Sequence, residues 1–238
     1  MECFEKGLLT EREIGFPLPW GDAPTMVRLL DLIARREGIG DLLAEGARRA
    51  AAVLGRGASD LAVEVKGLEL GMHEARGKKG LALSYATAPR GADHMEGFHD
   101  PSLAVPNAWP ELGVTEAMDR FTLEGKPRAV RLAEDYTSFI NTVPLCSFMS
   151  LTVGGIRNTE EITGMLAAAT GWSDLTLAEE MAIGERAYNL ARVFTVRESG
   201  GAADDRLPAK LARRLRGGAS REQVVGNRDI QAALQEYY

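Results

Sequence analysis

Apolar residues recur at helical spacing near the start of the chain, between residues suited to helix ends. Asp22 can cap free N–H groups and Pro24 is tolerated in a first turn, so a helix is predicted from this point to about Gly38. A second helix is predicted from Asp41, as its cap, to Gly55. The periodic apolar positions of the first helix are Met26, Leu29, Leu30 and Ile33. The pattern predicts a helical hairpin.

The middle of the chain loses this periodicity. Apolar residues alternate over residues 61–65, which predicts a short extended segment. The glycine-rich stretch 67–91 leaves room only for a short helix over 81–87, and its glycines favour tight turns or close backbone approach. Residues 88–125 are rich in proline and are predicted to be irregular, in a region too long for a simple connector.

Helical periodicity returns over residues 130–140 and ends near Pro144, which would break a continuing helix. A last short helix is predicted over 229–238. Two capping boxes lie between them, Asn158 with Glu161 and Thr176 with Glu179, and predict helices that run to about residues 170 and 198. The fold class is therefore mainly α, with a long loop-rich central region.

Composition and charge narrow the functional classes. Hydrophobic residues make up 45% and charged residues 26%, which is ordinary for a globular protein. The formal net charge of -6 disfavours binding to nucleic acid or to an anionic membrane. No apolar run approaches the roughly 20 residues that span a bilayer. The two cysteines, Cys3 and Cys146, are far apart, which favours a reducing, cytoplasmic location.

All three histidines, His73, His94 and His99, fall in the irregular centre together with several carboxylates. Histidine titrates near neutral pH and binds metals, so this clustering permits an acid–base or metal role. The spacing is not diagnostic, and solvated loop or buried structural histidines are equally compatible with it. Cys146 follows an apolar helix and, by the same reasoning, is typical of a small buried hydrophobe.

Several motifs in a fixed order give a more specific indication. The segments, from residue 36 to residue 189, are Arg36–Gly46, Val65–Leu70, Arg76–Gly77, Tyr85–Thr87, Arg90–Gly91, His94, the segment ending at Cys146, and Ile183–Asn189. In this order they resemble the aldehyde:ferredoxin oxidoreductase family, and the resemblance covers nearly the whole chain. It implies that residues 1–63 end a middle helical domain and that residues 64–238 form a C-terminal helical domain.

The resemblance also implies cofactors and partners. Members of the family hold tungsten or molybdenum through two pterins in an upstream domain, beside a [4Fe–4S] cluster that passes electrons to ferredoxin. Three cluster cysteines and a catalytic glutamate of the family lie upstream of the region that this chain resembles. The isolated chain is therefore expected to lack both cofactors and to be inactive without an upstream pterin-binding domain or subunit.

The resemblance implies functional roles for four positions of this sequence. His94 matches the active-site histidine, and Cys146 matches the remaining cluster cysteine. Asn141 and Leu145 are expected to contact the cofactor, although Asn141 replaces the family's pterin-contacting Asp and Pro144 replaces a Gly.

The resemblance implies oxidation of aldehydes to carboxylic acids, and the departure at Asn141 leaves other functions open. One alternative is a subunit of a related aromatic thioester reductase. Another is a helical binding or assembly module that has lost its cofactor. A homo-oligomer is also left open.

Overall fold

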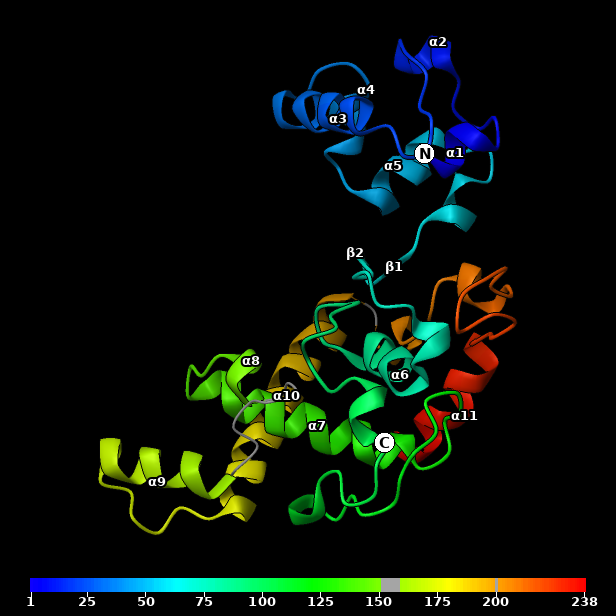
Figure 1. Cartoon of the computed structure of the whole chain (residues 1–238). Helices are drawn as coiled ribbons and strands as arrows, with labels where there is room; N and C mark the ends of the chain where they lie inside the picture. The colour runs from blue at the N-terminus through cyan, green and yellow to red at the C-terminus, as the bar shows by residue number, and fades with distance from the viewer. Residues whose placement is uncertain (151–158, 200) are drawn as a thin grey trace.

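The computed structural model describes residues 1–150, 159–199 and 201–238, and it is mainly helical, as predicted (Figure 1). A small N-terminal group of helices lies apart from a larger helical body in Figure 1. The first group contains α1 (Glu2–Glu5), α2 (Glu11–Ile14), α3 (Ala23–Arg35), α4 (Ile39–Leu43) and α5 (Ala47–Leu54). The α-helices of the larger body are α6 (Lys79–Thr87), α7 (Lys126–Thr142), α8 (Ser147–Ser150), α9 (Thr159–Thr170), α10 (Leu177–Ser199) and α11 (Asn227–Tyr237).

The first predicted helix is confirmed as α3. Its N-cap is Asp22, whose carboxylate accepts a hydrogen bond from the Thr25 N–H at 3.0 Å. The prediction of one continuous helix from Asp41 to Gly55 is wrong. Asp41 lies inside α4 instead of capping a helix, and Gly46 adopts a φ of 83°, which separates α4 from α5.

A short 3₁₀ helix, η1 (Ala58–Leu61), leads into a two-stranded antiparallel hairpin, so the extended segment is shorter than predicted. Strand β1 (Glu64–Val65) pairs with β2 (Leu68–Glu69), and Val65 lies opposite Leu68. Lys66 and Gly67 form the turn with positive φ values of 53° and 90°, as a type I′ hairpin turn requires. This turn points the Lys66 side chain into the body.

The central region follows the prediction closely. The short helix α6 covers the predicted residues 81–87 and begins two residues earlier. Beyond it the chain is irregular, apart from short 3₁₀ helices, η3 (Asp100–Leu103) and η4 (Pro110–Leu112). A further 3₁₀ turn, η2 (Ala75–Gly77), precedes α6, and η5 (Ala202–Asp204) and η6 (Ala209–Ala212) follow α10.

Helices α7 and α10 form the main packed pair of the body. A Cβ added to Gly184 of α10 would lie only 1.8 Å from the backbone oxygen of Asp135 in α7, so the two backbones approach closely at this glycine. The capping box at the start of α10 is confirmed, because the Glu179 carboxylate accepts from the Thr176 N–H at 2.8 Å and the Thr176 hydroxyl from the Glu179 N–H at 3.3 Å. The other predicted cap, Asn158, lies outside the described residues.

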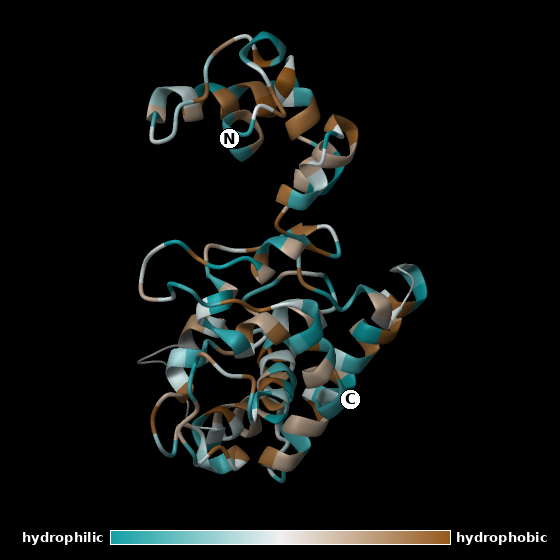
Figure 2. Ribbon diagram, turned by 90° about the vertical axis from the view of Figure 1, so that its right-hand side faces the viewer, coloured by the Kyte–Doolittle hydropathy of each residue, from teal (hydrophilic) through white to brown (hydrophobic). Residues whose placement is uncertain are grey.

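Two clusters of buried apolar side chains hold the described residues together. The smaller cluster is in the N-terminal group and centres on Leu9, Ile14, Phe16 and Leu18. The larger joins α6, α7 and α11 with the irregular centre, and its most enclosed members include Leu81, Tyr85, Tyr136, Ile140 and Ile230. Apolar and polar stretches alternate along the helices of both parts (Figure 2). The boundary near residue 63 between a middle and a C-terminal helical domain of the family stays a prediction.

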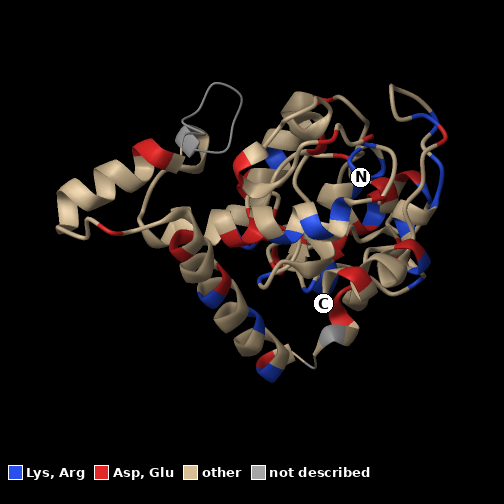
Figure 3. Ribbon diagram, turned by 90° about the horizontal axis from the view of Figure 1, so that it is seen from below, with Lys and Arg blue, Asp and Glu red and all other residues tan. Residues whose placement is uncertain are grey.

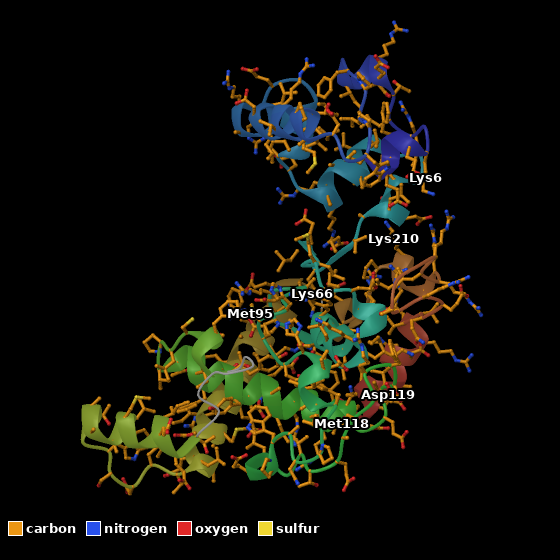
Figure 4. The ribbon with its side chains drawn as sticks, in the orientation of Figure 1. Lys6, Lys66, Met95, Met118, Asp119 and Lys210 are labelled. Carbon is orange, nitrogen blue, oxygen red and sulfur yellow. The ribbon has the colours of Figure 1, made fainter. Side chains whose placement is uncertain are left out.

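Ion pairs connect segments that are distant in the sequence. Lys210, labelled in Figure 4 on the side of the body that faces the N-terminal group, pairs with Glu2 of α1. Inside the body, Asp205 accepts from Lys66 at 2.7 Å and from Arg192 of α10 at 2.6 Å, and it also bonds the Tyr238 hydroxyl. The side chains of Asp205, Lys66 and Arg192 are all at least nine-tenths buried, so this cluster fixes the hairpin and the C-terminus to α10.

Glu134 of α7 predicts a pH dependence of stability. Its carboxylate accepts from the Thr87 hydroxyl at 2.8 Å and from the Tyr237 hydroxyl, and burial raises the pKa of Glu134 to about 7. A raised folded pKa means that this stabilising contribution is complete below the unfolded pKa near 4.5 and is lost as pH rises towards 7. Wild type should therefore lose stability relative to Glu134→Gln between pH 4.5 and pH 7.

Denaturant unfolding of both proteins at several pH values from 4 to 8 would measure this difference. Glu124→Gln, at an exposed position, is the matched control and should track wild type. A constant difference between wild type and Glu134→Gln across this range would contradict the assignment.

Lys and Arg residues are interspersed with Asp and Glu along the ribbon in Figure 3. Among the helices of the described residues, none combines the length and apolar character that would let it cross a bilayer.

Candidate functional site

The structure brings the three histidines together. The ring centroids of His73 and His99 are 4.3 Å apart, those of His73 and His94 are 4.8 Å apart, and those of His94 and His99 are 6.1 Å apart. The rings come from two irregular segments, His73 from the one before α6 and both His94 and His99 from the one between α6 and η3. We call these residues the histidine cluster.

Helix α6 fixes the side of the histidine cluster formed by His99. The adjacent Asp100 accepts from the N–H groups of Gly80 at 2.9 Å and Leu81 at 3.0 Å, so its carboxylate caps the start of α6. The fully buried Lys126 at the start of α7 pairs with the same carboxylate. Because Asp100 is held by two helices, the neighbouring His99 has little freedom to move.

The loop that carries His94 is held by its own polar contacts. Asp93 pairs with Arg90 and accepts from the Met95 N–H at 2.8 Å. Burial, together with the nearby Asp93, raises the pKa of Glu96, whose carboxylate lies 3.5 Å from Arg90. These contacts hold the residues on both sides of His94 in the sequence.

Two glycines of the predicted glycine-rich stretch permit close approach to this loop, as expected. A Cβ at Gly71 would lie 2.8 Å from Nδ1 of His94, so the glycine leaves room for the imidazole. A Cβ at Gly91, which has a φ of 110°, would lie 2.3 Å from the backbone oxygen of Val65 in β1. The hairpin and the His94 loop can therefore pack against each other.

Lys78 lies between two of the imidazoles. Its Nζ is 3.1 Å from Nδ1 of His73 and 2.9 Å from Nδ1 of His99. Burial and the nearby Lys78 ammonium lower the pKa of His99 to about 4 and also lower that of His73. Both shifts favour the neutral form of the imidazole.

The histidine cluster lines a cavity of about 340 Å³. This size lies at the lower end of the range for small-molecule sites. The other lining residues are mostly apolar: Met95, Gly97, Phe98, Pro101, Ser102, Ser147 and Phe148. Met95 is labelled in Figure 4. The cavity thus combines an apolar wall with convergent imidazoles.

The segment ending at Cys146 reaches the edge of this cavity. Ser147 and Phe148 of α8, which directly follow Cys146, line the cavity with His94. Asn141 and Cys146 are exposed, whereas Leu145 is half-buried against the larger apolar cluster. The structure therefore brings the surroundings of His94 and Cys146 together, and it leaves Asn141 and the Cys146 thiol accessible from outside.

The sequence left open whether the three histidines bind a metal ion, and the structure gives this interpretation no support. Within the residues described, no group of three or more His, Cys, Asp or Glu side chains is arranged to hold a metal ion, and the Lys78 ammonium would repel a cation placed between His73 and His99. Sequence reasoning missed Phe98 and Phe148 as cavity residues and Lys78 as the partner of two lining imidazoles. Lys78 belongs to no motif, and its contact with His99, 21 residues along the chain, depends on the fold.

A mainly helical body with an imidazole-edged apolar cavity has the features that are typical of a small-molecule site. Comparison with known proteins identifies the family. The family described as aldehyde ferredoxin oxidoreductase, domains 2 and 3, matches residues 1–238, and the chain belongs to this family.

Its relatives include tungsten-containing oxidoreductases. The chain is 34% identical over 215 residues to the tungsten-containing aldehyde ferredoxin oxidoreductase of Pyrococcus furiosus, a match that covers 89% of the chain and 33% of the relative. It is 32% identical to the enzyme of the same description from Thermococcus kodakarensis, over 100% of the chain and 37% of the relative. The chain thus spans about a third of the length of these curated relatives.

More distant similarities share the fold. The aliphatic sulfonate oxidoreductase, WOR-like subunit, of Pyrococcus furiosus is 29% identical over 100% of the chain and 35% of that protein. The solved active site complex BamBC of benzoyl coenzyme A reductase, in complex with 1,5-dienoyl-CoA, superimposes with a TM-score of 0.71 at 22% identity, covering 100% of this chain and 39% of the solved one.

Proposed function

We propose that this chain forms the helical part of a tungsten or molybdenum pterin oxidoreductase that oxidises aldehydes to carboxylic acids. Electrons would leave through a [4Fe–4S] cluster to ferredoxin. The observation that carries the proposal is the shared cavity: His94 lines it together with Ser147 and Phe148, the residues next to Cys146. The proposed catalytic histidine thus shares a cavity with the two residues that follow the proposed cluster ligand, which supports the proposal.

His94 would act on the substrate carbonyl. An imidazole N–H that donates to the aldehyde oxygen stabilises the negative charge that builds there as the carbonyl carbon is attacked. Phe98 and Phe148 would bind the hydrocarbon part of the aldehyde and exclude water from the carbonyl.

The residues around Cys146 fit the cofactors that the family implies. The exposed thiol can serve as one of the four thiolates of a cluster whose other ligands come from outside this segment. The exposed Asn141 amide can both donate to and accept from a pterin, and the half-buried Leu145 would support the chain between them. When bound, the pterin-held metal and the cluster would supply the two-electron redox chemistry of the reaction.

An upstream pterin-binding domain or subunit is part of this proposal. The outer surface of α10 leaves Leu190, Val193 and Phe194 exposed, and a hydrophobic surface of this kind is typical of a contact between domains. We propose that the complete enzyme works in the cytoplasm.

Cys146→Ser in the complete, cofactor-loaded enzyme tests the proposal. Loss of one thiolate should deplete the cluster's iron and slow electron transfer to ferredoxin, while tungsten or molybdenum content stays close to wild type. Iron and metal analysis, together with ferredoxin reduction, would measure both effects. Cys3→Ser is the matched control, since Cys3 lies in the N-terminal apolar cluster. Normal iron content in Cys146→Ser would refute the cluster assignment.

Reduction of an aromatic thioester is the second candidate. Asn141 supplies no negative charge at a position where the family has Asp, and the aromatic side chains of Phe98 and Phe148 suit an aromatic ring. Parallel assays with benzaldehyde and with an aromatic thioester would separate the two reactions.

A further inference from the structure

Lys78 imposes a chemical state on two imidazoles of the histidine cluster. A lysine ammonium has three N–H donors and cannot accept a hydrogen bond. Its Nζ lies 3.1 Å from Nδ1 of His73 and 2.9 Å from Nδ1 of His99. Each Nδ1 must therefore present its lone pair to Lys78. A neutral imidazole with an unprotonated Nδ1 carries its proton on Nε2.

The ordinary form of a lysine side chain at neutral pH is the ammonium, because its pKa lies about three units higher. Burial and the nearby Arg120 lower the pKa of Lys78, whereas Asp100 opposes this shift. The position of Nζ within hydrogen-bond distance of two Nδ1 atoms suits a group that donates to both.

We propose that Lys78 fixes His73 and His99 as Nε2–H donors, which together bind a carbonyl or carboxylate oxygen of a small, largely apolar molecule in the cavity. Both rings line the cavity, and Lys78 already occupies their Nδ1 atoms, so Nε2–H is the ring donor left for a ligand. The positive charge of Lys78 behind the rings favours an electron-rich oxygen and disfavours a cation.

The apolar wall defines the rest of the ligand. Met95, Phe98, Pro101 and Phe148 line the same cavity and offer no charged side chain. A molecule with one oxygen-bearing end and a hydrocarbon or aromatic body matches this division. The inference rests on the proposed function only where it equates this molecule with the aldehyde or its carboxylate product.

Lys78 is a positioning residue in this arrangement, because it acts through the imidazoles. His94 is a separate donor on the same cavity, and its ring centroid lies 4.8 Å from that of His73 and 6.1 Å from that of His99. Two fixed donors beside His94 would orient the substrate oxygen before any reaction occurs.

Nitrogen-15 NMR of the full chain, labelled at histidine, tests the proposal directly because the chain has only three histidines. The spectra are recorded at pH 7.5, about one unit above the ordinary histidine pKa. In wild type, His73 and His99 should each show a protonated Nε2 and a hydrogen-bonded, unprotonated Nδ1. In Lys78→Met both Nδ1 resonances should move towards the position of a nitrogen without a hydrogen bond. Lys78→Arg should restore them, because arginine is also only a donor. Lys79→Met, at the neighbouring half-buried lysine, should leave the spectrum unchanged.

An Nδ1–H proton on either ring of wild type would overturn the proposal. Unchanged Nδ1 resonances in a folded Lys78→Met would overturn the role of Lys78. If Lys78→Met does not fold, the wild-type and Lys78→Arg spectra still decide the outcome.

Titration with benzoate, followed by the same resonances, tests the ligand class. Benzoate should move the His73 and His99 Nε2 resonances, and Lys78→Met should weaken its binding about 10-fold, the effect of losing one charge-supported hydrogen bond. Binding that is equal in wild type and Lys78→Met, or that leaves both Nε2 resonances in place, would overturn the ligand assignment. These measurements need no bound metal, so they are independent of whether the complete enzyme oxidises aldehydes.

Discussion

Asp205→Asn is expected to lower the free energy of unfolding by about 3–5 kcal/mol, the usual cost of removing one partner from a buried ion pair. Asp205 is fully buried and faces Lys66 and Arg192, whose side chains are 5% and 9% exposed. The variant keeps the shape of the side chain but leaves two buried cations without their anion.

The ionisation of Asp205 supports this expectation. Burial alone would raise the pKa of Asp205, but hydrogen bonds from Arg192, Lys66 and Tyr238 outweigh it and hold the pKa below its ordinary value. The stabilisation is therefore present above the unfolded pKa near 3.8 and is lost as pH falls through the lower folded pKa. At neutral pH, wild type has the full contribution that the variant lacks.

Equilibrium denaturation at pH 7 measures the effect. Asp204→Asn is the matched control, because Asp204 is adjacent, its side chain is 31% exposed and its nearest cation, Arg206, is 3.9 Å away. The control should change stability by less than about 0.5 kcal/mol. Equal stabilities for the two variants would show that the buried cluster does not hold the hairpin and the C-terminus to α10.

His94→Ala in the complete, cofactor-loaded enzyme is expected to lower the turnover of aldehyde by about 10²-fold or more, the usual scale for a positioned hydrogen-bond donor to a developing oxyanion. The expectation rests on the proposed function. The cavity should keep its shape, because Asp93 and Asp100 are held by other partners than His94. Metal and iron content should therefore stay close to wild type.

Steady-state kinetics with matched cofactor content measures this effect. His94→Gln, which keeps an N–H donor, should recover part of the lost turnover. Glu111→Gln, at an exposed position on η4, is the control and should behave as wild type. Full activity in His94→Ala with a matched cofactor load would mean that His94 is a structural loop histidine.

Local patterns in the sequence determined most of the helical architecture. The Asp22 cap and the Thr176 capping box fix helix starts by bonds to N–H groups three residues away, so neighbouring residues suffice to predict them. The prediction of a continuous second helix failed because Gly46 has a positive φ of 83°. The apolar periodicity around this glycine does not reveal that conformation.

The candidate functional residues, too, were predicted from the sequence only in part. The order of the motifs singled out His94 and Cys146, because a motif is read along the chain and needs no coordinates. Their assigned roles stay predictions. The sequence also grouped His73, His94 and His99 in one irregular region, yet their spacing could not say whether the rings meet.

Only the tertiary structure decided that they do. Asp100 is fixed by α6 and α7 together, and the two histidine-bearing segments on either side of α6 converge because these helices pack against each other. The position of Lys78 between two imidazoles and that of Asp205 between two cations also depend on segments far apart in the chain. Helix caps and periodicity act over a few residues, whereas such polar contacts depend on the distance between their elements, which the packing of the apolar core sets.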